Sequence, residues 1–128
     1  MKIKNIGLAW VTTADITKAK DFFANILELE VTADSQEHGW LEFKAADSSF
    51  LLGVGQVKPD DENSPVMPGY NAVVTFTVDD IVAAKKELEA KEVDIYDIVE
   101  VPGHVKMAFM QDPDGNVFQI VQMLEPKA

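Results

Sequence analysis

DITKAK, at residues 15–20, recurs as DIVAAK at residues 80–85, 65 positions further along the chain and without a gap. Each copy follows a short apolar run, residues 8–11 or residues 73–78, and opens a pattern of apolar residues at helical spacing. The four shared positions alone could arise by chance. Their common strand-then-helix context indicates two copies of one supersecondary unit, so that positions in one copy can be compared with those in the other.

The first half predicts one helix and four strands. Strands are expected at residues 3–12, 30–34, 40–43 and 50–54, the third after a turn at Glu37-His38-Gly39. The helix is expected to begin at Asp15, whose carboxylate suits the positive end of the helix dipole. Apolar residues at helical spacing then predict one buried stripe, made of Ile16, Ala19, Phe22, Phe23, Ile26 and Leu27.

The second half predicts the same order of elements. A strand at residues 71–78 leads into a helix from Asp80 to about Lys91, and a strand follows at residues 93–99. Two more strands are expected, at residues 105–111 and 117–123.

The boundary between the halves is expected in a segment rich in proline and acidic residues, residues 56–69. We therefore expect a single domain covering residues 1–128, made of two βαβββ halves (about 1–55 and 70–125) joined by this linker. A chain of 128 residues with 47% hydrophobic content suits one globular domain with a substantial core.

The charge restricts the possible partners. The net charge is −11, and all eleven basic residues are lysines. Nucleic acid is excluded as an expected partner, because binding phosphates needs a basic face. Without arginine the chain also lacks the side chain that best grips carboxylates and phosphates, so a neutral or cationic ligand is favoured over an anionic one.

The cellular location is predicted from what the sequence lacks. There is no cysteine, which fits a reducing cytoplasm. No apolar run approaches the roughly 20 residues needed to cross a bilayer, and the N-terminus has no secretory signal, so we expect a cytoplasmic protein without a membrane partner.

The twin βαβββ order, the aspartate-led helices and the turn Asp112-Pro113-Asp114-Gly115-Asn116 resemble the vicinal oxygen chelate superfamily. That superfamily includes glyoxalase I, extradiol dioxygenases and bleomycin-resistance proteins. The resemblance covers essentially the whole chain, and the turn is its most specific element. It implies an α+β fold in which tandem βαβββ repeats form curved mixed sheets around a cup-shaped cavity, with the helices outside. It also implies a homodimer.

Metal-using members of this superfamily take ligands from the first and last strands of each half. The matching positions in this chain are Leu8 and Val73 on the first strands and Gln119 on the last strand, with either Leu51 or Gly53 as its counterpart. None of these residues carries an imidazole or a carboxylate, the groups that suit such a metal. The sequence therefore predicts no metal and no other cofactor.

Strand alternation predicts which side chains would line the cup. Leu8 shares a face with Trp10, and Val73 shares one with Thr75 and Thr77. Trp40 and Glu42 also share a face, but the sequence leaves open whether that face points inward. Met107 and Phe109 are expected in the core. The candidate ligand-binding residues are Leu8, Trp10, Trp40, Glu42, Val73, Thr75, Thr77 and Gln119, and no catalytic residue is assigned.

Three functions remain open at this point. The sequence favours a metal-independent, bleomycin-resistance-like or glyoxalase-like protein that binds a small, mostly apolar or cationic molecule. The alternative is a metal-dependent lyase, isomerase or oxygenase of the glyoxalase or dioxygenase type with displaced ligands. A third possibility is an interaction module whose cup is filled by its own side chains.

Overall fold

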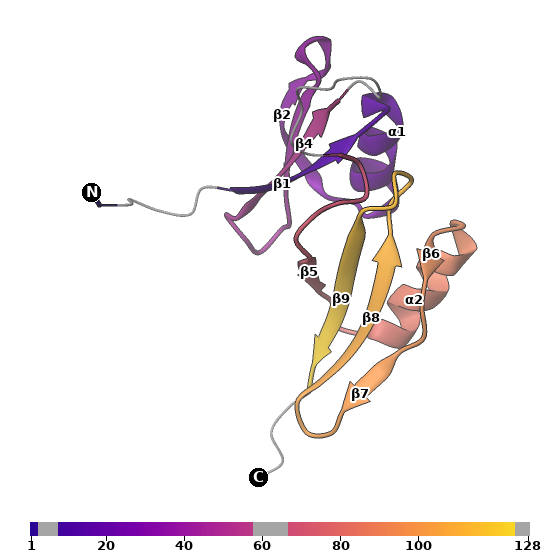
Figure 1. The fold of residues 1–128 in the computed structure, drawn as a ribbon. Coiled ribbons are helices and arrows are strands. Elements are labelled where there is room, and N and C mark those ends of the chain that lie inside the picture. Colours follow the sequence, from indigo (N-terminus) through magenta and orange to yellow (C-terminus); the bar gives the residue numbers. More distant parts are fainter. Residues whose placement is uncertain (3–7, 58–66, 125–128) are drawn as a thin grey trace. The chain divides into compact units, whose positions relative to one another are not determined.

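A computed structural model describes residues 1–2, 8–57 and 67–124 of the chain. It forms two compact units, residues 1–70 and residues 71–128, each with helical and strand segments (Figure 1). The predicted α+β class with mixed sheets is confirmed. Residues 3–7 of the first predicted strand and most of the predicted linker lie outside the described residues. In the described part, no helix is both long and apolar enough to span a bilayer.

The first unit is a four-stranded sheet in the order β1-β4-β3-β2. Strand β1 pairs in parallel with β4, and the other pairings are antiparallel. In chain order its elements are β1 (Leu8–Thr13), α1 (Ile16–Lys20), the π-helix η1 (Asp21–Ile26), β2 (Glu30–Ser35), the short 3₁₀ helix η2 (Gln36–His38), β3 (Trp40–Lys44) and β4 (Leu51–Gln56).

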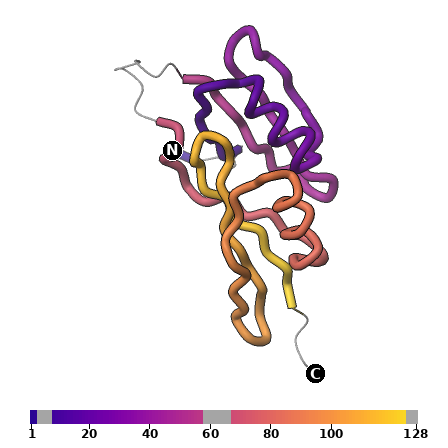
Figure 2. The backbone as a smooth tube through the Cα atoms, turned by 90° about the vertical axis from the view of Figure 1, so that its right-hand side faces the viewer, coloured from indigo at the N-terminus to yellow at the C-terminus, as the bar shows by residue number. Residues whose placement is uncertain are grey.

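The second unit repeats this connectivity in a five-stranded sheet. Its main path runs β5-β9-β8-β6, with β5 parallel to β9, and β7 also pairs with β8. Figure 2 shows the hairpin of β7 and β8 extending past the end of α2. The elements are β5 (Val74–Thr77), α2 (Ile81–Ala90), β6 (Asp94–Ile95), β7 (Val99–Val101), β8 (Val105–Gln111) and β9 (Val117–Met123).

The single strand expected at residues 93–99 is wrong, because two short strands, β6 and β7, take its place. Ile95 pairs with Met110, whereas Val99 pairs with Met107. One strand thus advances by four residues while its partner advances by three, which is a bulge that interrupts regular pairing.

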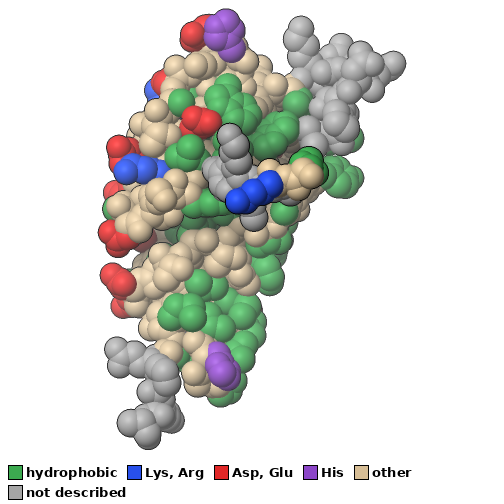
Figure 3. All heavy atoms as spheres, turned by 90° about the vertical axis from the view of Figure 1, so that its left-hand side faces the viewer, with side chains coloured by type: hydrophobic (Ala, Val, Ile, Leu, Met, Phe, Trp, Pro, Cys, Tyr) green, Lys and Arg blue, Asp and Glu red, His purple; other side chains and the backbone are tan. Residues whose placement is uncertain are grey.

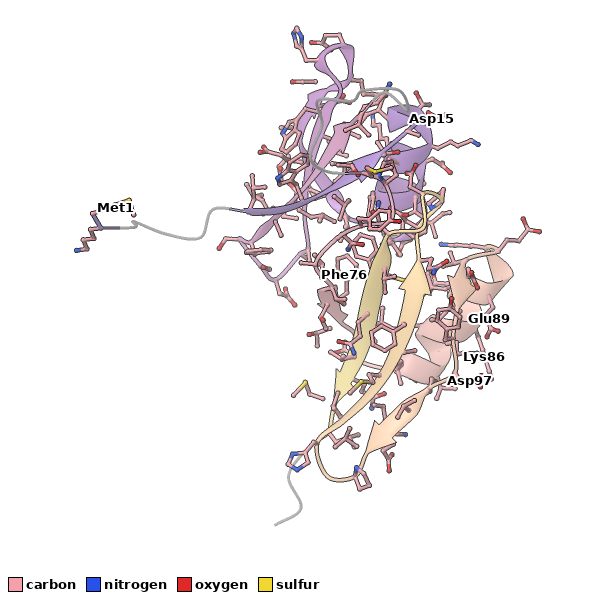
Figure 4. The ribbon with its side chains drawn as sticks, viewed as in Figure 1. Met1, Asp15, Phe76, Lys86, Glu89 and Asp97 are labelled. Atoms are coloured by element: carbon pink, nitrogen blue, oxygen red, sulfur yellow. The ribbon has the colours of Figure 1, made fainter. Side chains whose placement is uncertain are left out.

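Both helices begin with the predicted aspartate. The Asp15 carboxylate accepts hydrogen bonds from two backbone N–H groups of the first turn of α1 (Figure 4). The Asp80 carboxylate accepts one from the Ala83 backbone N–H at 3.1 Å. These bonds satisfy N–H groups that have no partner inside the helix.

A glutamine from the last strand of each unit completes the same helix start. The Gln56 side-chain oxygen accepts a hydrogen bond from the Ile16 backbone N–H at 3.0 Å. The Gln122 side-chain oxygen accepts one from the Ile81 backbone N–H, also at 3.0 Å. The two units therefore repeat a side-chain interaction as well as a strand order.

The first helix departs from the regular α-helix that its apolar stripe predicts. After Lys20 it continues as a π-helix, in which the Leu27 N–H donates to the Phe22 carbonyl at 2.9 Å. In each unit the helix is followed by a glutamate with left-handed backbone. Glu28 (φ 58°) follows the continuous helix formed by α1 and η1, and Glu92 (φ 62°) follows α2. The interval from the capping aspartate to this glutamate is one residue longer in the first unit, and π-winding accommodates the extra residue.

In each unit the core lies between the helix and one face of the sheet. Alternate strand residues face the helix and are buried, whereas their neighbours occupy the opposite face, which we call the open face. The buried set in the first unit includes Val11, Phe22, Phe23, Leu41, Phe43, Leu52 and Val54, and in the second Ile81, Leu88, Ala108, Met110, Phe118 and Ile120.

Candidate ligand-binding site

The direction of Trp40 and Glu42 follows from their neighbours on β3. Leu41 and Phe43 are fully buried, and the Phe43 ring lies 5.5 Å from that of Phe23 on η1. Trp40 and Glu42 alternate with these residues, so they lie on the open face. The structure thus places Trp40 and Glu42 on the side of the sheet opposite the helix.

Two glycines on β4 form the floor beneath the tryptophans. Gly53 is paired with Trp10 on one side and with Glu42 on the other, and Gly55 is paired with Trp40. A Cβ atom added to Gly53 would lie 2.7 Å from Cζ2 of Trp40 and 3.0 Å from Cβ of Trp10. The indole rings therefore occupy the space that side chains on β4 would need.

The two indoles contact each other over this floor. Their ring centroids are 5.7 Å apart and the ring planes are inclined by 58°. Trp10 is 46% exposed, and Trp40 is half-buried. We call this surface, made of Trp10, Trp40, Gly53 and Gly55, the indole shelf. The exposure of Trp10 leaves part of its ring available to a ligand. Leu8, half-buried, lies on the same face.

Of the two charged residues on β3 beside the shelf, Lys44 has an ion-pair partner and Glu42 has none among the described residues. Lys44, on the same face of β3, lies 3.6 Å from a Glu30 carboxylate oxygen. Glu42 is half-buried, and no ion-pair partner of its carboxylate is found among residues 1–2, 8–57 and 67–124. The shelf therefore has one negative charge at its edge that no lysine of the described chain neutralises.

The candidate residues of the second unit share the open face of its own sheet. The Thr75 hydroxyl donates a hydrogen bond to the Gln119 side-chain oxygen at 2.9 Å. The Gln119 amide nitrogen donates to the Met107 sulfur at 3.1 Å. Val73 and Thr77 are exposed on the same face. The Gln119 amide is thereby held in one orientation.

The expectation that Met107 and Phe109 belong to the core is wrong for Phe109, which is 43% exposed. Both residues lie on the open face, because Phe109 pairs with Gln119 and Met107 pairs with Val121. Alternation with the buried Ala108 and Met110 is the sequence signal that would have placed them there. Met107 is half-buried and contacts Gln119.

Exposed hydrophobic side chains gather on the open face of the second unit. Figure 3 shows hydrophobic side chains gathered along one side of this unit and acidic side chains along the other. Charged residues such as Lys86, Glu89 and Asp97 lie instead on the helix side (Figure 4). The exposed apolar set includes Val73, Val99, Val101, Phe109 and Met123.

The positions at which a metal would be held carry no suitable donors. In the second unit Thr75 pairs with Gln119, and the equivalent pair in the first unit is Trp10 with Gly53. Gly53, rather than Leu51, is therefore the counterpart of Gln119. A carboxylate cannot be accommodated at Gly53 without displacing the Trp40 ring.

Other residues do not supply a replacement metal site. Across the described ranges, no group of three or more His, Cys, Asp and Glu side chains could hold a metal ion. His38 lies in the turn before β3 with its side chain 79% exposed, and His104 lies in the exposed turn between β7 and β8. The described residues do not fit a divalent metal centre.

The turn at residues 112–116 has a structural role in leading into β9. Asp112 is 7% exposed, and its carboxylate accepts hydrogen bonds from the backbone N–H groups of Asp114 and Asn116 at 2.9 and 2.8 Å. It also accepts one from the Asn116 side-chain amide at 2.9 Å. Burial raises the pKa of Asp112, against the lowering effect of these bonds.

The sequence profile of the Glyoxalase/Bleomycin resistance protein/Dioxygenase superfamily matches residues 3–120. The chain belongs to this superfamily, as the repeat and the final turn indicated. No curated protein matches this chain.

Solved structures share the fold along almost the whole chain. TnmS3, an antibiotic-binding protein from Streptomyces sp. CB03234, is 27% identical with a TM-score of 0.75, covering 97% of this chain and 99% of its own. A glyoxalase/bleomycin resistance protein from the same organism is 26% identical with a TM-score of 0.73, covering 91% and 98%. A lactoylglutathione lyase from Agrobacterium tumefaciens is 16% identical with a TM-score of 0.72, covering 95% and 96%, and shows likeness of fold alone.

Proposed function

We propose that this protein binds a small, mostly apolar or cationic molecule without a metal, and that the indole shelf is the main contact surface in its first unit. The observation that carries this proposal is the pair of contacting indoles laid over Gly53 and Gly55, with Trp10 46% exposed. Flat aromatic surface beside a few polar groups is typical of small-molecule sites.

Two further findings support binding over metal catalysis. The positions equivalent to superfamily metal ligands are occupied by leucine, valine, glycine and glutamine. The similar Streptomyces protein TnmS3 is an antibiotic-binding protein. In the second unit we propose Val73, Thr75, Thr77 and Gln119 as ligand contacts, together with Phe109, because they share one open face.

The experiment is a titration followed by intrinsic fluorescence and by calorimetry. The chain has two tryptophans and both lie in the shelf, so their emission reports on this site alone. Against a panel of small aromatic and cationic compounds, we expect saturable binding that Trp10→Ala weakens about tenfold, given the contact energy of an aromatic side chain.

The matched control is Phe50→Ala, which removes an aromatic residue of the same exposure (46%) just before β4, where alternation with Leu51 places it in phase with the buried Leu52 and away from the open face. It should leave affinity unchanged. Flat calorimetric traces across the panel would contradict the proposal. Stoichiometric metal in protein purified without chelator, measured by elemental analysis, would favour the metal-dependent enzyme instead.

We also propose that the protein is a cytoplasmic homodimer. Support for the location comes from the absence of cysteine in the sequence. Support for self-association comes from Val99, Val101 and Met123, exposed apolar residues on the open face of the second unit that are not among the proposed ligand contacts, since monomeric proteins rarely expose extended apolar patches.

A further inference from the structure

We propose that the indole shelf recognises a compact organic cation, a tertiary or quaternary ammonium group, whose charge lies on the indole faces beside Glu42. This inference rests on the proposed function and specifies the chemical class of its ligand. It follows from the pairing of charges on the open face, the geometry of the two rings and the shortage of hydrogen-bond acceptors around them.

The carboxylate of Glu42 supplies the charge that would attract a cation to the shelf. Glu42 occupies the row of Gly53, across which it faces Trp10, and it is half-buried without an ion-pair partner in the part of the chain that the structure describes. The lysine nearest along the strand, Lys44, is already engaged by Glu30 at 3.6 Å. A partly desolvated carboxylate attracts a cation more strongly than an exposed one does.

The two indole rings offer their exposed faces, and not the space between them, to a cation. A cation over an indole face is attracted by the quadrupole of the ring, and Trp is the most effective side chain for this interaction. A planar group inserted between two rings needs about 7 Å, twice the contact distance of about 3.5 Å. The indole centroids are only 5.7 Å apart and the planes are inclined by 58°, so the ligand must lie on the exposed faces.

The surroundings of the shelf favour a methylated ammonium over a primary ammonium. A primary ammonium carries three N–H donors and loses energy when they are unmatched. Around the shelf, the side chains of Leu8 and Trp10 offer no acceptor, and Gly53 and Gly55 have no side chain. The hydroxyl groups on this face belong to Thr12, which pairs with Gly55 and is only 4% exposed, and to Ser35, which pairs with Trp40. Among the described residues of β1, β3 and β4, Glu42 is the one that carries a carboxylate. An ammonium whose hydrogens are replaced by methyl groups needs no such partners, and its methyl surface suits the indole rings.

The net charge of −11 acts in the same direction over a longer range. It raises the local concentration of cations around the protein and disfavours anions. This field favours any cation, so the selection of a methylated ammonium depends on the shelf itself.

The experiment compares choline and tetramethylammonium with 3,3-dimethyl-1-butanol, a neutral analogue of choline, by calorimetry and tryptophan fluorescence. We expect choline to bind at least about tenfold more tightly than the neutral analogue. Glu42→Gln should weaken choline binding by about fivefold or more while leaving the neutral analogue unaffected.

The matched control is Glu28→Gln, which makes the same change of charge at an exposed helix end of the same unit. It should leave choline binding unchanged. If Glu42→Gln fails to fold, unmodified protein still gives an answer. Choline binding should then weaken between about 0.05 M and about 0.5 M NaCl, whereas binding of the neutral analogue should not.

Three outcomes separate the two proposals. If the neutral analogue binds as tightly as choline, this inference is overturned and the proposed function stands. If only the aromatic compounds of the wider panel bind and no ammonium does, the inference is likewise wrong. If neither ammonium compounds nor the panel bind, the proposed function fails as well.

Discussion

At the scale of single residues, the candidate site depends on glycines as much as on tryptophans. Gly53 and Gly55 are buried because the indoles of Trp10 and Trp40 cover them. The absence of side chains on this part of β4 lets two large rings lie close to the strand. The same absence removes the position from which the last strand of the first half would offer a metal ligand.

Replacing Gly53 by alanine should disturb the shelf. The new Cβ atom would lie 2.7 and 2.8 Å from two ring carbons of Trp40, so the ring must move. We expect a loss of about 1–3 kcal/mol in unfolding free energy, as for other overpacked sites, and a shift in tryptophan emission. At Gly55 an added Cβ atom would lie 3.0 Å from its nearest neighbour, Cζ3 of Trp10, so Gly55→Ala should show a smaller effect in the same direction. Equal stability of Gly53→Ala and the parent protein in urea unfolding would contradict the geometry.

The buried turn carboxylate gives a pH-dependent prediction. Burial raises the pKa of Asp112 above its ordinary value of 3.8, so the folded protein binds this proton more tightly than the unfolded chain. The stability from Asp112 is therefore complete below pH 3.8 and declines as the pH rises through the folded pKa.

The prediction is tested against Asp112→Asn, which cannot titrate. Relative to this variant, the parent protein should lose stability as the pH rises above 3.8 in urea unfolding. The other carboxylates titrate in both proteins and cancel in the difference. A relative gain for the parent protein over this range would show that the sign is wrong.

At the scale of elements, the two helices show what an inserted residue does. Each starts at a capping aspartate held beside a glutamine of the last strand, and each ends at a glutamate with positive φ. The first is longer by one residue and contains the π-helix. Its apolar stripe was predictable from the sequence. The π-winding was not, because Phe22, Phe23 and Ile26 fit the spacing of an ordinary helix.

Glycine at position 92 should stabilise the second helix. Left-handed backbone costs a side-chain-bearing residue about 1 kcal/mol, and Glu92 adopts φ 62°. We therefore expect Glu92→Gly to raise the unfolding free energy by about 0.5–1 kcal/mol in thermal or urea unfolding. Glu92→Gln keeps the backbone strain and removes only the charge, so a gain of equal size in that variant would assign the effect to charge instead.

At the scale of the whole molecule, the repeat and its turns were readable from the sequence, and the superfamily match agrees with them. Strand alternation correctly placed Leu8 with Trp10 on one face. It could not orient Trp40 and Glu42, because both faces of β3 contain an aromatic residue, and only contact with the helix distinguishes them. Phe109 was misjudged because an apolar strand residue is more often buried.

The proposed dimer predicts a molecular mass in solution of twice that of one chain, measured by light scattering after gel filtration. Val101→Asp places a charge on the apolar open face of the second unit, where Val101 is 40% exposed, and should shift the mass to that of a monomer. Val82→Asp makes the same change on α2, where Val82 is 46% exposed, and should leave the dimer intact. A monomeric parent protein would refute the proposal.

The glutamine contacts at the helix starts bear on how the chain acquires its structure during synthesis. The bond from Gln56 to α1 joins residues that all leave the ribosome before any residue of the second unit, whereas Gln122, the partner of α2, emerges 66 residues after Gln56. We expect the first helix to be locked in place while the second half is still being translated. A stalled nascent chain whose residues 1–70 have all left the ribosome should already resist proteolysis within its first unit, and rapid cleavage there would refute this order of events.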